Sequence, residues 1–439
     1  MMGEKDVLIC IPTCDRSEMV GEVLKYELEY YTRLGLAIRY YDSSSDDQTE
    51  TLIRAYQEKG YENLSYIRTE SGLCIDDKII GIWKNDKTLL DYRYIWLIND
   101  SISILEDALR VILPVLSDEY HLVRLPVMGS GSKEDMICYD TDEWFHKCSG
   151  SMAHMASTVM STKLLTGPVD WEGLRAKYVV NGDIRSWEHG FFFTVGFYLE
   201  RILDFPDFKG IMLGNCFKWR RDSELKQEMS YWTAMVFQSW GKSYCDTILR
   251  LPDAYTRKIE VIRTSDNLTV GRFEERSMLG YRFSGLYSLR VFFRLLRYWR
   301  LISDVPLRRL FLIALEPSER IKRRYGKKTF DEARWGENLR ELEGRLGERP
   351  IIVYGAGLYG QRVVERLKQD GFAGRLQYVA VSDPARNIDV LFGIKVRGIR
   401  ELTWLREEAD VIVATLPDTA EQIKKTLREL HFQNILTLF

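Results

Sequence analysis

Three segments of the amino-terminal region place polar or acidic residues directly after an apolar run. The segment PTCDR contains Thr13 and Asp15, a second run ends at Asp42, and a third continues into INDS, which holds Asn99 and Asp100. Carboxylates hold divalent cations, and a divalent cation neutralises the charge of a diphosphate. If the runs are parallel strands, their carboxyl ends meet at one edge of a sheet. The sequence therefore predicts a site for a cation and a diphosphate at that edge.

The elements that must position these residues alternate between strands and helices. Apolar runs predict strands at 7–11, 37–41, 64–67 and 94–98. Helical spacing predicts helices at 19–31, with Ser17 as its cap, then one capped by Ser45 or Asp46 that ends at 58, and helices at 75–84 and 105–115. This alternation is typical of an α/β fold, in which helices cover both faces of a mostly parallel sheet.

The rest of the chain divides into regions of different character. Residues 122–221 lack a regular period, 222–344 are mainly helical, and the segment from 350 to 439 restarts an α/β pattern. We therefore expect a catalytic domain at 1–225, a helical region with a charged linker at 226–345, and a small Rossmann-like domain at 346–439.

Composition excludes several classes of protein. The 62 basic and 64 acidic residues are nearly balanced, which gives no reason to expect a nucleic-acid partner. The 7 cysteines contain no CxxC pair, which argues against a disulfide framework or a thiolate zinc site. No apolar run approaches the ~20 residues that cross a bilayer, so we expect a cytoplasmic protein that is not integral to a membrane.

The motifs resemble those of a known family, the nucleotide-sugar-dependent glycosyltransferases of the GT-A fold, and most closely the inverting family 2. ICIPTCDR is similar to the PTYNR-like opening of that family, YYDSSSDDQTETLI to its DDGSxDxT-like motif, and YIWLINDSISIL takes the place of its DxD motif. The resemblance is good over residues 5–115 and faint as far as 221. It implies inverting transfer of a hexose or N-acetylhexosamine, most simply from a UDP-sugar, to a surface glycan, a glycoprotein or a lipid-linked acceptor.

The resemblance also implies roles for individual residues. Asp42 would hydrogen-bond the base or ribose, and Thr13 with Asp15 would line the nucleotide pocket. Lys78 would lie against the nucleotide, its alternative being an ordinary solvated lysine on a helix. The residues implied in donor binding around these motifs are Pro12, Thr13, Asp15, Arg16, Asp42, Lys78, Asn99 and Asp100.

The implied metal is Mg²⁺ or Mn²⁺, with Asp100 as its ligand. Asn99 stands where the family has its first acidic residue, so only one carboxylate is certain. One carboxylate with substrate phosphates and water is enough for Mg²⁺, although with weaker affinity. No organic cofactor is implied for the transfer.

An inverting transfer also needs a base for the acceptor hydroxyl. In the family an acidic pair before an apolar helix supplies it, and RSWEHGFFFTVGFYL is the comparable segment here. Glu188 is the favoured base, with His189 or Asp183 as alternates, and we expect the neighbouring apolar residues to raise the pKa of Glu188. The alternative is a carboxylate that only begins a helix.

Two basic features follow. CFKWRRDS, with Arg220 and Arg221, is similar to a family segment that closes over the diphosphate, or is a plain surface cluster. Residues 290–328 hold twelve Lys or Arg against three acidic residues. The region 287–328 is therefore expected either to contact the inner face of a membrane or to pack against the protein, with Phe292, Leu296 and Trp299 opposite its arginines.

The last region contains VYGAGLYG, with Gly355, Gly357 and Gly360 between a predicted strand and helix. This spacing suits a phosphate at a helix N-terminus, and Asp383 ends the next strand, 28 residues after Gly355. The segment resembles small Rossmann-like modules of polysaccharide-synthesis enzymes, which leaves open nucleotide binding or homo-oligomerisation.

Two rival functions remain open from the sequence. The first is an NAD(P)-dependent oxidoreductase or epimerase of sugar nucleotides, although no Tyr-x-x-x-Lys follows VYGAGLYG. The second is a catalytically inactive, nucleotide-binding scaffold subunit, for which Asn99 in place of an acid is the reason.

Overall fold

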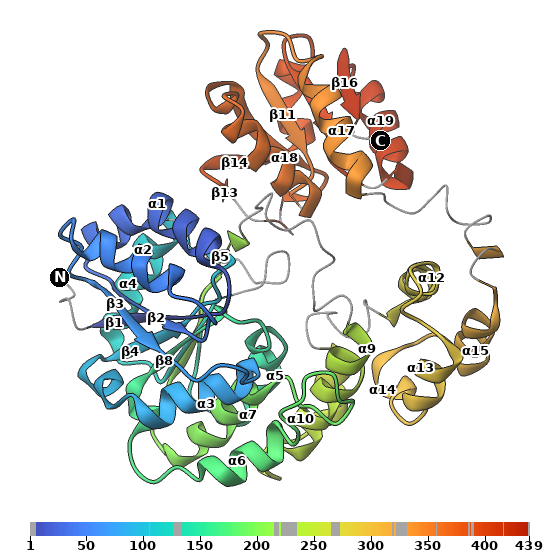
Figure 1. Cartoon of the computed structure of the whole chain (residues 1–439). Helices are drawn as coiled ribbons and strands as arrows, with labels where there is room; N and C mark the ends of the chain where they lie inside the picture. Colours follow the sequence, from blue (N-terminus) through green and yellow to red (C-terminus); the bar gives the residue numbers. More distant parts are fainter. Residues whose placement is uncertain are drawn as a thin grey trace. The chain divides into compact units, whose positions relative to one another are not determined.

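The chain forms two compact units (Figure 1). The computed structural model describes residues 6–104, 106–125, 134–214, 219–220, 235–264, 273–317, 320–321, 332–356, 358–384, 387, 390–415 and 417–437. The first unit comprises Met1–Val127 and Glu134–Ser318, and the second comprises Met128–Lys133 and Glu319–Phe439. The helices between residues 236 and 315 thus belong to the first unit, and the domain boundaries expected at 225 and 345 stay predictions.

An eight-stranded sheet organises the first unit, in the order β3-β2-β1-β4-β8-β6-β9-β7. The strands β1 to β4 are parallel, and β8 runs antiparallel to both β4 and β6. Their bounds are β1 Val7–Thr13, β2 Ala37–Asp42, β3 Leu64–Arg68, β4 Tyr94–Leu97, β6 Leu122–Arg124, β7 Met136–Cys138, β8 Thr158–Ser161 and β9 Gly210–Met212. A separate ladder pairs β5 (Ile102–Ser103) with β10 (Trp219–Arg220).

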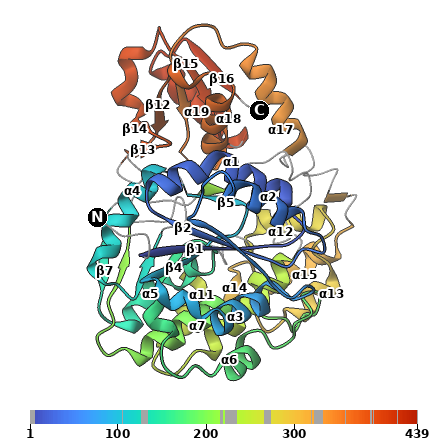
Figure 2. The ribbon, with the colours of Figure 1, turned by 60° about the vertical axis from the view of Figure 1, so that its left-hand side comes forward.

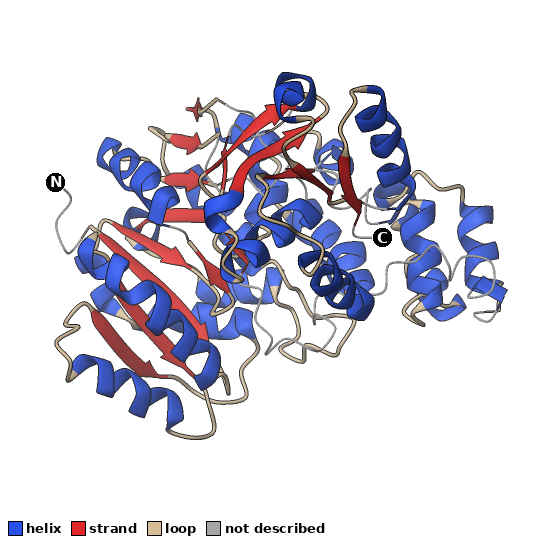
Figure 3. Cartoon of the chain, turned by 90° about the horizontal axis from the view of Figure 1, so that it is seen from above, coloured by secondary structure: helices blue, strands red, loops and turns tan. Residues whose placement is uncertain are grey.

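Helices cover both faces of this sheet (Figures 1 and 3). On one face, Val7, Ile9 and Ile11 of β1 join a buried core with α1 (Ser17–Arg33), α2 (Gln48–Gln57) and α4 (Glu106–Val115). On the other face lie α3 (Ile75–Asn85) and α7 (Phe193–Arg201), whose Trp83 and Phe197 rings are 4.7 Å apart. β1 is buried along its whole length, which explains its uninterrupted apolar run.

The order of the parallel strands creates a switch point between β1 and β4. From β1 the chain proceeds outward to β2 and β3 on one side and then returns to β4 on the other. In open α/β sheets, ligands bind beyond the carboxyl ends of the strands at such a point. Thr13 and the residues that follow β4 therefore occupy the favoured place for a site.

The predicted α/β class is confirmed, with corrections of detail. Each strand and helix predicted before residue 116 is present. The Ser17 cap was wrong, since Arg16 precedes α1 and the Ser17 hydroxyl instead donates to Gln48 Oε1 at 2.9 Å. The region without a regular period, 122–221, contains the four strands that complete the sheet and the helices α5 (Thr141–Met152), α6 (Trp171–Tyr178) and α7.

The remainder of the first unit is helical, as its sequence pattern predicts. Aromatic rings form much of its interior, with Phe237 5.4 Å from Tyr287 and Tyr287 5.8 Å from Trp299 between ring centroids. Its helices are α9 (Val236–Gln238), which continues through a π-helical turn at Ser239–Ser243, α10 (Tyr244–Arg250), α11 (Lys258–Thr264), α12 (Glu275–Phe283), α13 (Leu289–Arg294), α14 (Trp299–Ile302) and α15 (Leu307–Leu315).

The second unit contains a six-stranded sheet of order β13-β14-β12-β11-β15-β16 (Figure 2). All pairs are parallel except β13 with β14. The bounds are β11 Ile351–Tyr354, β12 Leu376–Val381, β13 Val390–Leu391, β14 Ile394–Gly398, β15 Asp410–Val413, β16 Asn434–Thr437, α17 Glu332–Glu343, α18 Leu358–Gln369 and α19 Pro417–Glu429. One core joins α17 and α18 to the sheet, and a second joins α19.

Among the described residues, no helix combines the length and the apolar character needed to cross a membrane.

Candidate functional site

The ends of β1 and β4 are joined through the side chain of Asp100. The Thr13 hydroxyl donates to Asp100 Oδ2 at 2.9 Å, and Arg16 Nη1 donates to Asp100 Oδ1 at 2.8 Å. Asp100 is 2% exposed, whereas the Arg16 side chain is 52% exposed. The carboxylate thus lies at the switch point of the sheet, with one guanidinium between it and solvent.

Lys78 reaches the same place from the first turn of α3. Its ammonium group donates to the Thr13 carbonyl at 2.6 Å and to Ser43 Oγ at 2.7 Å, and the residue is 4% exposed. Burial lowers the pKa of Lys78, and neighbouring acidic groups, Asp42 and Asp100 among them, oppose that shift. The alternative of a solvated surface lysine is therefore wrong.

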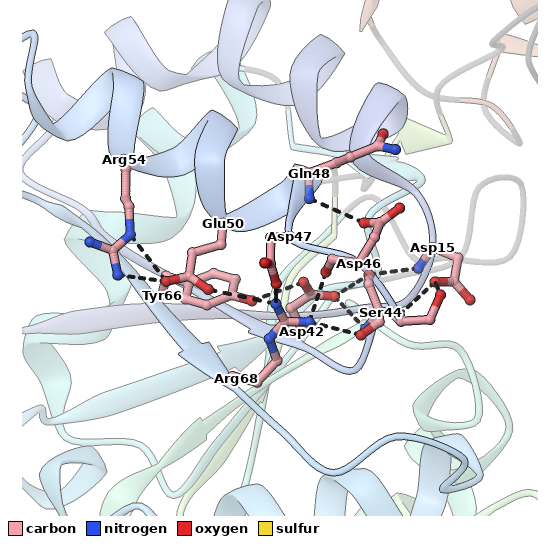
Figure 4. A network of polar contacts seen from close by, with 11 residues as sticks. Asp15, Asp42, Ser44, Asp46, Asp47, Gln48, Glu50, Arg54, Tyr66 and Arg68 are labelled. Atoms are coloured by element: carbon pink, nitrogen blue, oxygen red, sulfur yellow. Dashed lines mark hydrogen bonds and ion pairs between the residues drawn. The ribbon is translucent and has the colours of Figure 1, made fainter.

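Asp42 is buried and shapes the turn after β2 (Figure 4). Its Oδ1 accepts hydrogen bonds from the backbone N–H of Ser44, at 2.9 Å, and from the Ser44 hydroxyl, while its Oδ2 accepts from the Tyr66 hydroxyl at 3.0 Å. Both oxygens thus already have protein partners. A contact between Asp42 and a base or ribose stays a prediction.

Asp15 links the loop after β1 to the loop after β2. Its backbone N–H donates to Ser44 Oγ at 2.8 Å, and its Oδ1 accepts from the Ser45 N–H at 2.9 Å. Asp15 has a φ of 51°, a left-handed conformation that residues other than glycine rarely adopt. The hydrogen bonds from Ser45 lower the pKa of Asp15. The carboxylate is exposed, so it can still accept further bonds.

Arg68, at the end of β3, holds the second of these loops and was missed by the sequence analysis. Its Nη1 donates to the Ser44 and Asp46 carbonyls, each at 2.8 Å, and its Nη2 pairs with Asp47 (Figure 4). The signal was its position, since Arg68 ends β3 as Asp42 ends β2.

Asn99 and Asp100 supply the oxygens that suit a divalent cation. Asn99 Oδ1 is a buried atom without a hydrogen-bond partner in the described part of the chain, while its Nδ2 donates to Ser101 Oγ at 3.2 Å. Amide and carboxylate oxygens are both ligands for Mg²⁺ and Mn²⁺. Among the described residues, no group of three or more His, Cys, Asp or Glu is placed to hold a metal ion. The donor set fits an ion that takes its other ligands from a phosphate and water.

Of the three residues expected on the acceptor side, Glu188 lacks the apolar surroundings that were predicted for it. The Glu188 side chain is 66% exposed and lies 3.5 Å from Lys242 Nζ, so the apolar pocket expected around it is wrong. Asp183 is also exposed, and its Oδ1 accepts from the Arg185 N–H at 3.0 Å. No hydrogen bond or ion pair between described residues joins Glu188 or Asp183 to Asp100.

His189 is buried and faces Asp76, a residue that the sequence analysis missed. Its Nε2 lies 3.7 Å from Asp76 Oδ2, and its Nδ1 bonds to the Asn181 carbonyl, while Asp76 Oδ1 accepts from the Phe193 N–H at 3.2 Å. Burial raises the pKa of Asp76. Burial by itself would lower the pKa of His189. The hydrogen bonds of its ring and the negative charge of Asp76 outweigh burial, so the pKa of His189 is raised. The pair ties α3, which carries Lys78, to the start of α7.

Two predicted features lie partly or wholly outside the described residues. Arg220 belongs to β10, of which the structure describes the backbone, and Arg221 and Gly357 lie outside the described residues. Pro12 is buried near the end of β1.

The glycine motif of the second unit has the geometry of close strand-to-helix packing. Gly355 has a φ of 120°, and a Cβ on Gly360 would lie 1.7 Å from the Gly355 carbonyl oxygen. Only glycine therefore fits at Gly360, where α18 follows β11. Asp383 is exposed just beyond β12. A nucleotide at this motif stays a prediction.

No protein-family model matches the chain, and no curated protein does. Among solved structures, it is similar to residues 1–349 of S. aureus TarS in complex with UDP-GlcNAc, with a TM-score of 0.44, 12% identity, and coverage of 74% of this chain and 93% of that one. It is also similar to a mannosyltransferase from Pyrobaculum calidifontis in complex with GDP-Man and Mn²⁺, with a TM-score of 0.39, 12% identity, and coverage of 73% and 86%. For glucosyl-3-phosphoglycerate synthase from Mycobacterium tuberculosis, in complex with Mn²⁺, UDP and glucosyl-3-phosphoglycerate, the TM-score is 0.35, with 12% identity and coverage of 57% and 81%.

Proposed function

We propose that the first unit is a nucleotide-sugar-dependent glycosyltransferase that moves a hexose or N-acetylhexosamine from a UDP-linked donor to a hydroxyl group, with inversion at the anomeric carbon. The observation that carries the proposal is the cluster of Thr13, Arg16, Lys78 and Asp100 at the switch point of the parallel sheet. In such sheets, nucleotides bind at this place.

The charges of the cluster suit a diphosphate. Arg16 is half-exposed, and its planar guanidinium can form paired hydrogen bonds to phosphate oxygens. Lys78 is buried against the Thr13 carbonyl and adds positive charge in a setting where water screens little. The protein thus presents two cations to the leaving group, which gains negative charge as its bond to the sugar breaks.

We further propose that Asp100, with Asn99 Oδ1 beside it, holds a divalent cation when the donor binds. Mg²⁺ or Mn²⁺ would supply Lewis-acid stabilisation of the departing diphosphate. Asp100 could hold the ion while it keeps its bonds from Thr13 and Arg16, since its oxygens have further lone pairs.

On the acceptor side, Glu188 remains the proposed base. Its carboxylate reaches solvent, and an acceptor hydroxyl could approach it without displacing core residues. His189 is 1% exposed and is therefore unsuited to direct contact with an acceptor. Its role is instead to hold the loop that precedes α7. Asp183 is the exposed alternate. The proposed acceptors are a surface glycan, a glycoprotein or a lipid-linked saccharide at the inner face of the membrane.

Thermal denaturation of the purified chain with single ligands tests the proposal. A UDP-sugar with Mn²⁺ at a hundredfold excess over its Kd should stabilise the protein by about 2.7 kcal/mol, and Asp100→Ala should lose this effect. Stabilisation by NADH alone would favour a nicotinamide-dependent enzyme. If a UDP-sugar stabilises the protein but no acceptor mixture leads to release of UDP, an inactive scaffold subunit is favoured. If no nucleotide changes the thermal stability, the proposal is overturned.

A further inference from the structure

Four large apolar side chains of α13, α15 and the turn after α13 point into solvent. Phe293 is 60% exposed and Leu296 49%, while Leu312 is 44% and Leu315 52% exposed. The exposed surface around them also carries Arg290, Arg294, Arg297, Arg300 and Arg308. These nine residues are named the α13–α15 face. A group of exposed apolar side chains that basic residues surround usually marks a binding surface.

The two helices are in contact, which makes this face continuous. The rings of Phe293 and Phe311 are 6.3 Å apart, and those of Phe292 and Phe311 are 5.4 Å apart between centroids. Leu296 comes three residues after Phe293, and Leu315 comes four residues after Phe311. Leu296 therefore lies one turn beyond Phe293, and Leu315 lies one turn beyond Phe311, on the same side in each case. The exposed apolar groups thus border the seam between α13 and α15.

The exposed side chains are separate from those that hold the helices in place. Phe292 is 5% exposed and Trp299 1%, and Leu310 and Ile313 are fully buried. The sequence pattern predicted Leu296 on the side of Phe292 and Trp299, and this was wrong, because Leu296 lies among the exposed arginines. Phe293 and Leu296 can therefore change without opening the core.

The charge of the face is almost wholly positive. Arg290, Arg300 and Arg308 have no acidic side-chain partner within the described ranges, and the Arg294 guanidinium lies 4.9 Å from the Trp187 ring centroid. Arg297 is 74% exposed, with Asp246 at 4.0 Å. The nearby acid Asp304 is already paired with Arg263. A partner for this face must therefore be anionic and must also accept apolar side chains.

We infer that the α13–α15 face binds the surface of an anionic lipid bilayer. Phe293, Leu296, Leu312 and Leu315 would enter the boundary between headgroups and acyl chains, and the arginines would contact lipid phosphates. A free phosphate or an acidic protein accounts for the arginines but gives less reason for exposed phenylalanine and leucine together. The inference does not depend on the proposed transferase activity.

Co-sedimentation of the full chain with phosphatidylcholine vesicles, with and without phosphatidylserine, tests the inference. Binding is expected with phosphatidylserine, weaker at high salt, and absent or weak with phosphatidylcholine alone. The variant R290A/R300A should bind about thirtyfold less tightly, since each arginine near a membrane contributes ~1 kcal/mol. The variant F293S/L296S should also lose binding, and lowering the salt concentration should not restore it.

Matched controls separate this face from general properties of the chain. K25A/K59A removes two exposed charges elsewhere, and L90S/V111S removes apolar side chains that are 47% and 50% exposed. Both should bind vesicles like the wild-type chain, and circular dichroism should show all four variants folded. Equal losses in the controls would overturn the inference, as would absence of binding by the wild-type chain. Self-association by sedimentation velocity that F293S/L296S abolishes, without vesicle binding, would assign the face to a second copy and equally overturn it.

Discussion

Thr13 and Asp100 lie 87 residues apart in the sequence and share a hydrogen bond of 2.9 Å at the ends of β1 and β4. Asp100 has a second bond from Arg16, whereas Thr13 also uses its carbonyl to accept from Lys78. One buried carboxylate thus joins the ends of two neighbouring strands to Arg16, and Thr13 links Lys78 to the same cluster. The predictions for the site follow from this arrangement.

Replacing Asp100 should weaken donor binding far more than replacing Thr13. Asp100→Asn keeps the size of the side chain but leaves the Arg16 guanidinium without its ionic partner, and UDP-sugar affinity should fall by at least about tenfold. Thr13→Val removes one hydrogen bond, at a cost of about 1 kcal/mol in stability. Titration calorimetry with the donor compares the two variants. Equal affinities for Asp100→Asn and the wild-type chain would remove Asp100 from the proposed site.

Asn99 should control the affinity for metal. Asn99→Asp adds a second carboxylate next to Asp100, and we expect roughly tenfold tighter binding of Mn²⁺ in the presence of UDP, because ligand charge sets the affinity of such sites. Asn99→Ala removes the amide oxygen and should raise the Mn²⁺ concentration needed for half-maximal activity. Paramagnetic relaxation of water by Mn²⁺ measures the change in binding, and initial rates at increasing Mn²⁺ concentrations measure the change in activity. Activity that excess EDTA leaves unchanged would instead assign the phosphate charge to Arg16 and Lys78 alone.

The pair of Asp76 and His189 should make folding stability depend on pH. Both groups have a raised pKa in the folded chain, so the fold binds their protons more tightly than the unfolded chain does. Their contribution to the free energy of unfolding is therefore present in acid and is lost as pH rises, from about 3.8 upward for Asp76 and from about 6.5 upward for His189.

Urea denaturation at several pH values measures this contribution. The difference in stability between the wild-type chain and His189→Gln should narrow as pH rises from 6 to 9. His121→Gln is a suitable comparison, because burial lowers the pKa of His121 and the sign of its effect is opposite. If the stability difference between the wild-type chain and His189→Gln does not change with pH, the prediction that Asp76 and His189 titrate as a pair is wrong.

Glu188→Gln should lower kcat by about 10²–10⁴-fold and leave donor affinity intact, since a general base acts on the acceptor. Asp183→Asn is the matched control, because Asp183 is a similarly exposed carboxylate in the same loop. Initial rates of UDP release with saturating donor check both variants. If only Asp183→Asn loses activity, the base is Asp183.

The centre of the sheet was predictable because β1 and β4 are buried along their whole length and read as continuous apolar runs. Because parallel strands have their carboxyl ends at one edge of the sheet, the sequence alone was enough to predict that Thr13 and Asp100 lie close together. The strands β6, β7, β8 and β9 were missed because each has only three or four residues, too few to show a period.

The acceptor side was harder to predict because its contacts are long-range. Asp76 and Asp77 look like ordinary acids at a helix start, and only the contact between α3 and the start of α7 brings His189 against Asp76. Phe191, Phe192 and Phe193 did enter the core, but the chain turns between Glu188 and His189, so one side chain faces solvent while the next is buried. Nearness in sequence was therefore a poor guide to environment.

The Asp15 N–H donates to Ser44, and the Asp15 carboxylate accepts from Ser45, so the protein's own atoms tie two loops together. These loops need no ligand to become ordered, so an incoming nucleotide does not have to offset the entropy of fixing them. Capture of substrate should consequently be fast, with its rate set by diffusion and by electrostatic attraction to Arg16 rather than by a slow rearrangement of the backbone.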